Sequence, residues 1–301
     1  MNIFMTGATG NVGQAVTPIL LDQGHSLTVL VRKRSDMRGC RIVIGELERI
    51  DRFAREIAAC DAIVHLARPR AAERSVVLGQ DITGTAGLIE AWRNGVFLYT
   101  SSSSVYGYPF GALNEQARIE LWNRYARKKY ANELQLRLAE RSNGRRGAVI
   151  LRAALIFAIN REHRGRQFLD EVYKQCRLGS RFVFESEQSL ATYGCAFIGG
   201  ADFGRVVDVA LTRDISGIYN IAGGFCTWRE LVETFNRVAG TKAEFVVRAD
   251  GRPQAGEYRL PQSRTELDTT AFANAAGFAA KETLEELVET FVRAERASAL
   301  A

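Results

Sequence analysis

The sequence predicts an α/β protein built on a doubly wound parallel sheet. Two observations predict it. Short apolar runs alternate with amphipathic stretches through about the first hundred residues, which is the pattern of repeated strand–helix units. A glycine-rich segment also separates the first apolar run from the first amphipathic stretch. Repeated units of this kind form parallel sheets whose ligands bind at the carboxyl ends of the strands.

The first unit is the apolar run NIFMT at 2–6, followed by GATGNVG at 7–13 and the amphipathic AVTPILLDQG at 15–24. Gly7 permits a tight turn, Gly10 lets backbone approach a diphosphate, and Gly13 lets the helix pack close to the strand. The free N–H groups of the helix would hold the diphosphate. A chance glycine-rich turn is the alternative, but the flanking strand and helix favour a Rossmann-type dinucleotide site. Its turn includes Thr9, Asn11 and Val12.

The second apolar run, SLTVLVR, ends in Arg32 and is followed by further cations. A site that prefers NAD places a carboxylate here to bind the ribose hydroxyls, whereas the 2′-phosphate of NADP requires a cation. A solvated basic turn is the alternative interpretation. The absent carboxylate and the cation at Arg32 together favour NADP(H), with NAD(H) possible.

Three more strands and a helix follow. RIVIGEL at 41–47, DAIVHLA at 61–67 and VFLYTS at 96–101 read as strands, and DITGTAGLIEAW at 81–92 as a helix. His65 reads as a packed strand residue, because no partner for chemistry is visible in the sequence.

Composition limits the classes of function. No apolar run reaches the roughly 18–20 residues of a membrane span, and the N-terminal MNIFMTG is unlike a signal peptide. The five cysteines and three histidines are scattered, so we expect no disulfide framework, no metal site and a cytoplasmic location. The net charge is +6, but the arginines are spread between acids, which disfavours nucleic-acid binding.

Taken together, TGATGNVG, GEL, HLA, DITGTAGLIEAWRNGV, YTSSSSVYG and YARKK make the chain resemble the extended short-chain dehydrogenase/reductase family, which includes epimerases, dehydratases and ketone reductases. Weaker similarity continues in GIYNIAGGFCTWRELVE and TELDTTAFANAAGF. The resemblance implies a Rossmann domain over 1–157 and a smaller substrate-binding lobe over 158–301, with about 195–222 returning to the sheet edge. It also implies a homodimer through helices near 72–93 and 118–141.

The segment NRYARKKYANEL holds two tyrosines and two lysines, and the segment alone leaves Tyr125 and Tyr130 both open as candidates. The family's YxxxK pattern matches Tyr125 and Lys129, one helical turn apart. The resemblance implies that Tyr125 is the general acid/base and that Lys129 favours its phenolate and holds the nicotinamide ribose. It places the catalytic serine at Ser102, with neighbouring serines as alternatives. Lys128, Arg127 and Tyr130 are expected at the surface or an interface.

Further cofactor contacts are implied at the ends of the other strands. Glu46 and Leu47 would border the adenine. The remaining expected contacts are Leu66, Ala67, Arg68, Thr100 and Ala154.

The chain departs from the sugar-nucleotide members of the family at several positions. The Asp-Glu pair of the dehydratases is replaced by Ser103 and Ser104. Leu155 stands where an Asn is expected, and Cys195 where an Arg binds the ligand's diphosphate. A site without donors for a diphosphate would not offset its desolvation. The resemblance therefore implies a small non-nucleotide substrate.

We expect NADP(H)-dependent oxidoreduction of a carbonyl or alcohol. The alternatives are an NAD(P)-dependent sugar epimerase of the same family, and a catalytically silent NADP-binding sensor or scaffold. The basic segment 160–167 could hold an anionic substrate or be a solvated loop. Asp81 replaces a frequent Asn of the family, without an evident reason. The sequence does not identify the substrate or the direction of reaction.

Overall fold

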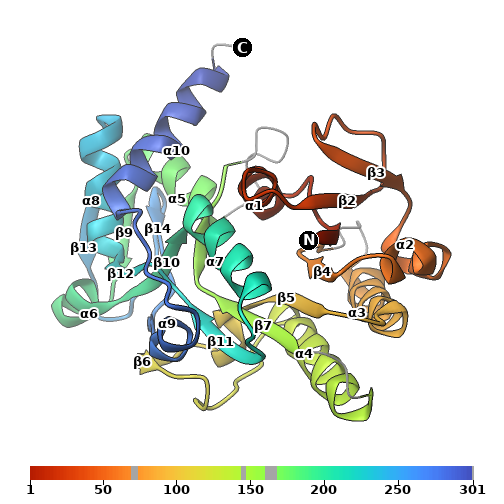
Figure 1. Ribbon diagram of the computed structural model, residues 1–301. Coiled ribbons are helices and arrows are strands. Elements are labelled where there is room, and N and C mark those ends of the chain that lie inside the picture. The colour runs from red at the N-terminus through yellow and green to blue at the C-terminus, as the bar shows by residue number, and fades with distance from the viewer. Residues whose placement is uncertain (69–73, 144–146, 160–167, 300–301) are drawn as a thin grey trace.

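The computed structural model describes residues 1–68, 74–143, 147–159 and 168–299. Seven parallel strands form the main sheet, in the order β11-β7-β5-β4-β1-β2-β3 (Figure 1). The predicted doubly wound α/β sheet is thereby confirmed. The strands are β1 (Asn2–Thr6), β2 (Ser26–Val31), β3 (Cys40–Ile44), β4 (Ala62–His65), β5 (Val96–Ser102), β7 (Ala148–Ala153) and β11 (Gly217–Ile221).

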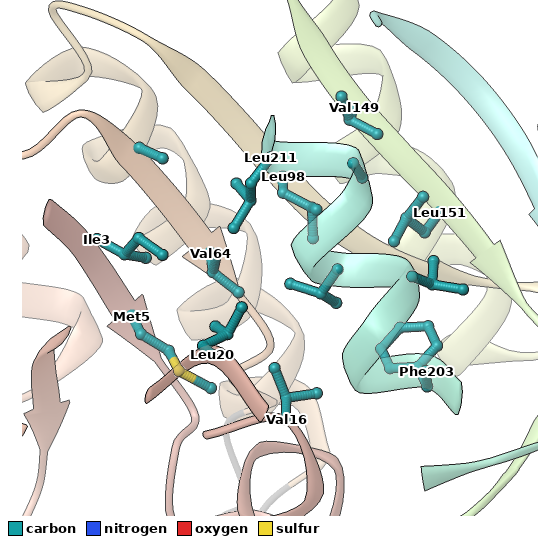
Figure 2. Packing of buried hydrophobic residues seen from close by; sticks show 14 of the residues in the cluster. Ile3, Met5, Val16, Leu20, Val64, Leu98, Val149, Leu151, Phe203 and Leu211 are labelled. Carbon is teal, nitrogen blue, oxygen red and sulfur yellow. The ribbon is translucent and has the colours of Figure 1, made fainter. Parts of the chain in front are cut away.

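Helices cover both faces of this sheet, because successive strand residues point to opposite sides. Ile3 and Met5 of β1 lie in one core with Leu20 and Phe203, which come from the helices on that face (Figure 2). Phe4 points the other way, into the core beneath the opposite helices. The first face carries α1 (Asn11–Asp22) and α7 (Gly200–Thr212); the second carries α3 (Arg74–Ala91), α4 (Arg124–Asn143) and the 3-10 helix η1 (Leu47–Phe53), with α2 (Ala54–Ala58) beside η1.

A second region, at the left of Figure 1, is built on two smaller sheets and an aromatic core. One sheet has the order β12-β10-β15-β6 with β8 beside β10, and the other is β13-β9-β14. The strands are β6 (Phe110–Leu113), β8 (Leu155–Phe157), β9 (Arg181–Phe184), β10 (Gly194–Gly199), β12 (Gly224–Thr227), β13 (Glu244–Val247), β14 (Glu257–Tyr258) and β15 (Arg264–Leu267). The helices are α5 (Phe168–Arg177), α6 (Glu187–Thr192), α8 (Trp228–Ala239) and α10 (Leu284–Ala299), whereas α9 (Thr270–Ala276) packs beside β11 on the main sheet.

The chain passes between the two regions within one continuous segment. Strand β10 belongs to the second region, α7 packs on the main sheet, and β11 pairs with β7 at the edge of that sheet. The main sheet and the smaller sheets are therefore adjacent. Strand β8, which follows β7 in the chain, also crosses this boundary, because it pairs with β10.

Helix α4 begins later than the range 118–141 suggested. It starts at Arg124 because the Asn123 side chain accepts a hydrogen bond from the backbone N–H of Ala126 at 2.8 Å, which satisfies one free donor of the first turn. Of the other range, 72–93, the first two residues lie outside the described part of the chain, and α3 ends at Ala91. No helix among the described residues is long and apolar enough to cross a membrane.

A buried ion pair fixes α4 against the sheet. The guanidinium of Arg152, on β7, donates to both carboxylate oxygens of Glu133 on α4, with the shortest distance 2.7 Å. Arg152 also donates to the Tyr106 hydroxyl at 3.0 Å, and Tyr106 donates to Asn220 at 2.7 Å. The side chains of Arg152 and Glu133 are 3% and 0% exposed, so each charge depends on the other for its stabilisation.

Replacing Arg152 with Met should therefore lower the free energy of unfolding by about 3–5 kcal/mol, because the Glu133 carboxylate loses its buried partner. Urea denaturation followed by circular dichroism would measure the loss. Lys174→Met is the matched control: its pair with Glu171 is exposed, and its loss should stay below about 1 kcal/mol. Equal losses in the two variants would contradict this account of the Arg152 pair.

Candidate active site

A cleft of about 750 Å³ lies at the carboxyl ends of the main-sheet strands and is closed on its other side by the second region. The chain leaves β1 toward β2 and β3 and then returns to β4 on the other side of β1, so the strand order reverses at this place. Such a reversal opens a crevice where ligands of parallel sheets bind. The expected cofactor contacts at the strand ends, including Ala154 after β7, all line this one cleft.

The glycine-rich turn forms the floor of the cleft. Gly7 has a positive φ of 82°, and a Cβ there would stand 2.5 Å from the backbone nitrogen of Ala67. A Cβ on Gly13 would stand 2.1 Å from the carbonyl oxygen of Gly7. Larger residues at either place would force the loop and α1 away from the sheet. The N-cap Gly10 supplies no side-chain cap and the first turn of α1 holds no acid, so its N–H groups suit an anion.

Two buried oxygens in the cleft wall are not satisfied by the described residues. Asn11 Oδ1 and Thr100 Oγ1 have no hydrogen-bond partner there. Buried polar atoms of this kind ordinarily bond to protein, water or ligand. The ribose hydroxyls of a dinucleotide could donate to Asn11 and bond to Thr100, so the residues present fit a nicotinamide dinucleotide.

The exposed Arg32, just after β2, lines the cleft. Glu46, which caps η1, and Leu47 and Glu48, which begin it, line the same cleft. A cation and two carboxylates therefore share the part of the cleft where an adenosine would lie.

The three expected catalytic residues all line this cleft. Ser102 ends β5, and its hydroxyl donates to Ser104 Oγ and accepts from the Ser104 N–H, both at 3.2 Å. Tyr125 and Lys129 lie on consecutive turns of α4 and line the same cleft. The alternative serines, Ser101 and Ser103, also line the cleft, but the Ser101 hydroxyl is engaged by donating to the buried Glu133.

Lys129 is buried and anchors α4 to β5. Its ammonium donates to the Thr100 carbonyl at 2.6 Å and lies 4.7 Å from the Tyr99 ring centroid and 5.9 Å from that of Tyr125. Burial lowers the pKa of Lys129 to about 8, although the Asp81 carboxylate acts in the opposite direction. The Arg68 guanidinium, 5.6 Å from the Tyr125 ring, adds a second cation beside the phenol.

Lys128 was expected at the surface or an interface, and the surface alternative is wrong. Its side chain is buried, and its ammonium donates to Asp81 Oδ2 at 2.5 Å. Lys128 lies on a different face of α4 from Lys129, away from the cleft. That face packs against α3 and is not exposed to water. Tyr130 is half-buried against Val105 and its neighbours, and Arg127 is exposed.

His65 is a packed strand residue, as expected. Its two ring nitrogens bond to the hydroxyls of Thr6 and Thr85, at 2.7 and 3.0 Å. Burial lowers the pKa of His65 to about 3, so the ring is neutral at physiological pH.

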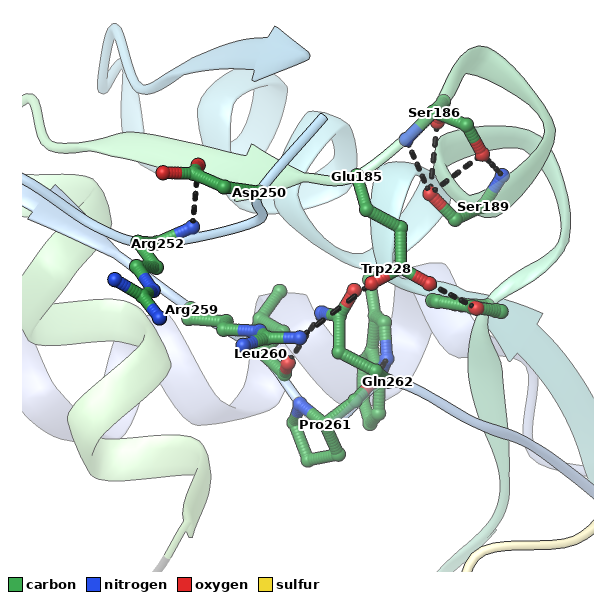
Figure 3. A network of polar contacts seen from close by, with 11 residues as sticks. Glu185, Ser186, Ser189, Trp228, Asp250, Arg252, Arg259, Leu260, Pro261 and Gln262 are labelled. Carbon is green, nitrogen blue, oxygen red and sulfur yellow. Dashed lines mark hydrogen bonds and ion pairs between the residues drawn. The ribbon is translucent and has the colours of Figure 1, made fainter. Parts of the chain in front are cut away.

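The wall opposite the sheet is aromatic and uncharged among the described residues. Tyr108 and Trp122 form a half-exposed pair with ring centroids 4.2 Å apart. Trp228 and Pro261 lie beside each other (Figure 3), and Trp228 donates its indole N–H to the Pro261 carbonyl at 2.8 Å. The ring centroid of Trp228 lies 5.4 Å from that of Phe168. The remaining residues of this wall include Gly107, Leu155, Ile156, Cys195, Ala196, Ser263 and Thr265.

Sequence reasoning did not single out the aromatic residues of this wall. They come from four separate segments, and although Trp228 lies within GIYNIAGGFCTWRELVE, no spacing in these segments marks an aromatic residue for binding. Leu155 and Cys195, which the resemblance did single out, line the wall. The basic segment 160–167 lies outside the described residues. Among the described residues, no three His, Cys, Asp or Glu side chains gather where a metal ion could bind.

Comparisons with known proteins agree with this fold. Residues 3–222 match the NAD dependent epimerase/dehydratase family, so the chain belongs to that family, which lies within the extended short-chain dehydrogenases/reductases. It is therefore an enzyme of the nicotinamide-dependent oxidoreductase and epimerase type.

Two curated relatives and one solved structure illustrate the similarity. An uncharacterized protein of Schizosaccharomyces pombe is 36% identical over 72 residues, 22% of this chain and 24% of that protein. The dTDP-glucose 4,6-dehydratase of Streptomyces niveus is 26% identical over 324 residues, 96% of this chain and 91% of the relative. A UDP-glucose-4-epimerase from Stenotrophomonas maltophila, with bound NAD and a formylated UDP-arabinopyranose, has a TM-score of 0.81 at 19% identity, covering 100% and 99% of the two chains.

Proposed function

We propose that this family member transfers hydride between NADP(H) and a carbonyl or alcohol of a small, uncharged, non-nucleotide substrate. One observation carries the proposal. Ser102, Tyr125 and Lys129 line the cleft beside the glycine-rich turn, whereas the wall opposite them offers no charged side chain among the described residues. A substrate with a diphosphate would bring two negative charges to a surface without a described cation to receive them.

The proposed chemistry divides between cofactor and protein. The nicotinamide, when bound, supplies or accepts the hydride. Tyr125 gives its phenolic proton to the substrate oxygen during reduction and accepts it during oxidation. Ser102 holds that oxygen by a hydrogen bond. The Lys129 ammonium favours the phenolate of Tyr125, and below about pH 8 it carries the charge that this requires.

The preference for NADP(H) rests on the end of β2, where Arg32 takes the place of a carboxylate. Its guanidinium is placed to bind a 2′-phosphate by charge-assisted hydrogen bonds. The NAD bound by the Stenotrophomonas epimerase, and the two nearby carboxylates of this chain, favour NAD(H) as the alternative.

A sugar-nucleotide epimerase is the second candidate function. The family and the full-length similarity to a UDP-glucose-4-epimerase favour it. Such an enzyme would retain its cofactor through purification and convert UDP-glucose without net oxidation. A catalytically silent sensor or scaffold is disfavoured because all three expected catalytic residues share the cleft. A cytoplasmic location and a homodimer through α3 and α4 stay part of the proposal.

Tyr125→Phe should lower kcat by about 10²–10⁴-fold for a substrate found by screening ketones and alcohols with NADPH and NADP, because it removes the transferred proton. Affinity for NADPH, measured by fluorescence, should change little. Tyr130→Phe is the matched control on the same helix and should keep its activity. Undiminished turnover by Tyr125→Phe would refute the role of Tyr125.

Arg32→Ala should weaken NADPH binding by about 10–100-fold and leave NADH binding nearly unchanged, since a charge-assisted bond contributes about 1.5–3 kcal/mol. Isothermal titration calorimetry with both cofactors measures this. Arg34→Ala, an exposed cation that does not line the cleft, is the control. Equal affinity of the parent protein for NADPH and NADH would contradict the preference.

Trp122→Ala should raise KM for aryl ketones by about 2–10-fold, because aromatic pairs contribute about 0.5–1.5 kcal/mol beyond the area they bury. Short aliphatic ketones should be affected less. Phe110→Ala, which removes an exposed ring outside the cleft, is the control. Conversion of UDP-glucose by the parent protein would instead favour the epimerase.

A further inference from the structure

A second buried charge pair lies directly behind the Tyr125–Lys129 pair. Asp81 of α3 and Lys128 of α4 form an ion pair in which the side chains are 2% and 7% exposed. Lys128 and Lys129 are adjacent in sequence, and their ammonium groups lie 5.8 and 5.9 Å from the centroid of the same Tyr125 ring. Two buried cations therefore flank one phenol.

Asp81 is held in place by neutral groups. Asn132 donates to Asp81 Oδ1 at 2.7 Å and to the Tyr99 hydroxyl at 3.1 Å. Thr85 donates to the Asp81 backbone carbonyl at 2.8 Å. Gln135 donates to the Asn132 side-chain oxygen at 2.9 Å. The carboxylate thus has a fixed place between α3 and α4, with one oxygen for Lys128 and one for Asn132.

The other titratable groups around this centre come from several elements. Arg68, after β4, contributes a further cation, and His65 of β4 is neutral because burial lowers its pKa to about 3. Glu133 of α4 is engaged by Arg152, and Tyr99 of β5 is neutral because burial raises its pKa. Of the two described carboxylates near Lys128 and Lys129, Glu133 is neutralised by Arg152, so Asp81 supplies the negative charge that acts on both lysines.

We propose that Asp81 and Lys128 are positioning residues for the Tyr125–Lys129 pair. Asp81 is the shared counter-ion of two buried ammonium groups, and Lys128 limits how much of that negative charge acts on Lys129. The pair thereby sets the pH at which Lys129 loses its proton. Its catalytic consequence rests on the proposed function, because it requires that Lys129 acts on Tyr125.

The two partners should act on Lys129 in opposite directions, because Asp81 carries the opposite charge and Lys128 the same charge. Burial disfavours the charged form of Lys129, and the attraction of Asp81 is the first effect that opposes it. Removing the Asp81 charge therefore lowers the pKa of Lys129. Removing Lys128 leaves the whole Asp81 charge to Lys129 and raises its pKa. Burial likewise raises the pKa of Asp81, and the charges of Lys129 and Lys128 more than offset this, so its carboxyl is ionised.

The chain contains six lysines, which makes a direct measurement practical. Lysine labelled with ¹³C at the ε-carbon gives one NMR signal per residue, whose shift reports loss of the ammonium proton. The four lysines outside the centre are exposed and supply the other four signals. The Lys129 signal is identified by its absence in Lys129→Met and should titrate near pH 8 in the parent protein.

Asp81→Asn should lower this midpoint, and Lys128→Met should raise it, each by about one unit or tenfold in proton affinity. The double variant removes the whole pair and should lie between them. Thr85→Val keeps every charge but removes the hydroxyl bonded to Asp81 and His65, so its midpoint should match the parent protein. An unchanged midpoint in Asp81→Asn, or shifts of the same sign in both single variants, would overturn the proposal.

The alkaline limb of the kcat/KM–pH profile should move in the same order as these midpoints, because turnover falls when Lys129 loses its charge. A structural role alone would lower activity without moving the limb in opposite directions. If the titration midpoints of Lys129 shift as stated while the alkaline limb of the kcat/KM profile stays fixed, the proposed role of Lys129 in catalysis is refuted, but the effect of Asp81 and Lys128 on the pKa of Lys129 stands. If the midpoints do not shift, the proposed effect of Asp81 and Lys128 on Lys129 is refuted.

Discussion

The site depends on how helix α4 is held against the sheet by buried charges. Lys129 bonds to the Thr100 carbonyl, Glu133 pairs with Arg152, and Lys128 pairs with Asp81. A buried charge is tolerated only where a partner meets it with good geometry. The three contacts reach β5, β7 and α3, so they allow α4 little freedom to slide or rotate. The position of Tyr125 over the cleft follows from that restriction, since Tyr125 lies one turn before Lys129 on the same helix.

The first half of the chain was largely predictable because its signals are local. Strand–turn–helix periodicity and the glycine spacing lie within a few residues of one another, and the observed sheet begins as they indicated. The start of α4 was misplaced because the decisive contact, the cap by Asn123, competes with a run of residues that also suits a helix. The position of Lys128 was mispredicted because it depends on a contact between residues far apart in the sequence. A lysine beside another lysine resembles a solvated surface, and its partner lies 47 residues earlier.

The wall opposite the sheet shows where prediction from the sequence ends. Tyr108, Trp122 and Trp228 are brought to one cleft by packing between strands and helices that are far apart in the chain. Each of these residues also fits an ordinary core or surface position when it is read in its own segment. The sequence could indicate only which expected residues are missing from this wall: Leu155 stands where a polar residue was expected, and Cys195 where an arginine was expected. Both lie on that wall.

The distribution of charge within the cleft connects these observations. Among the described lining residues, every charged side chain belongs to the main sheet, its connecting loops or α4; the second region contributes aromatic, aliphatic and small polar groups. A low-dielectric wall strengthens the field of the charges that face it, so Lys129 and Arg68 act more strongly on Tyr125 than they would in water. The same wall penalises any anion that it must desolvate. One arrangement thus gathers the charges of the described cleft lining on the side of Tyr125 and leaves the opposite wall, as far as the described residues form it, aromatic and uncharged.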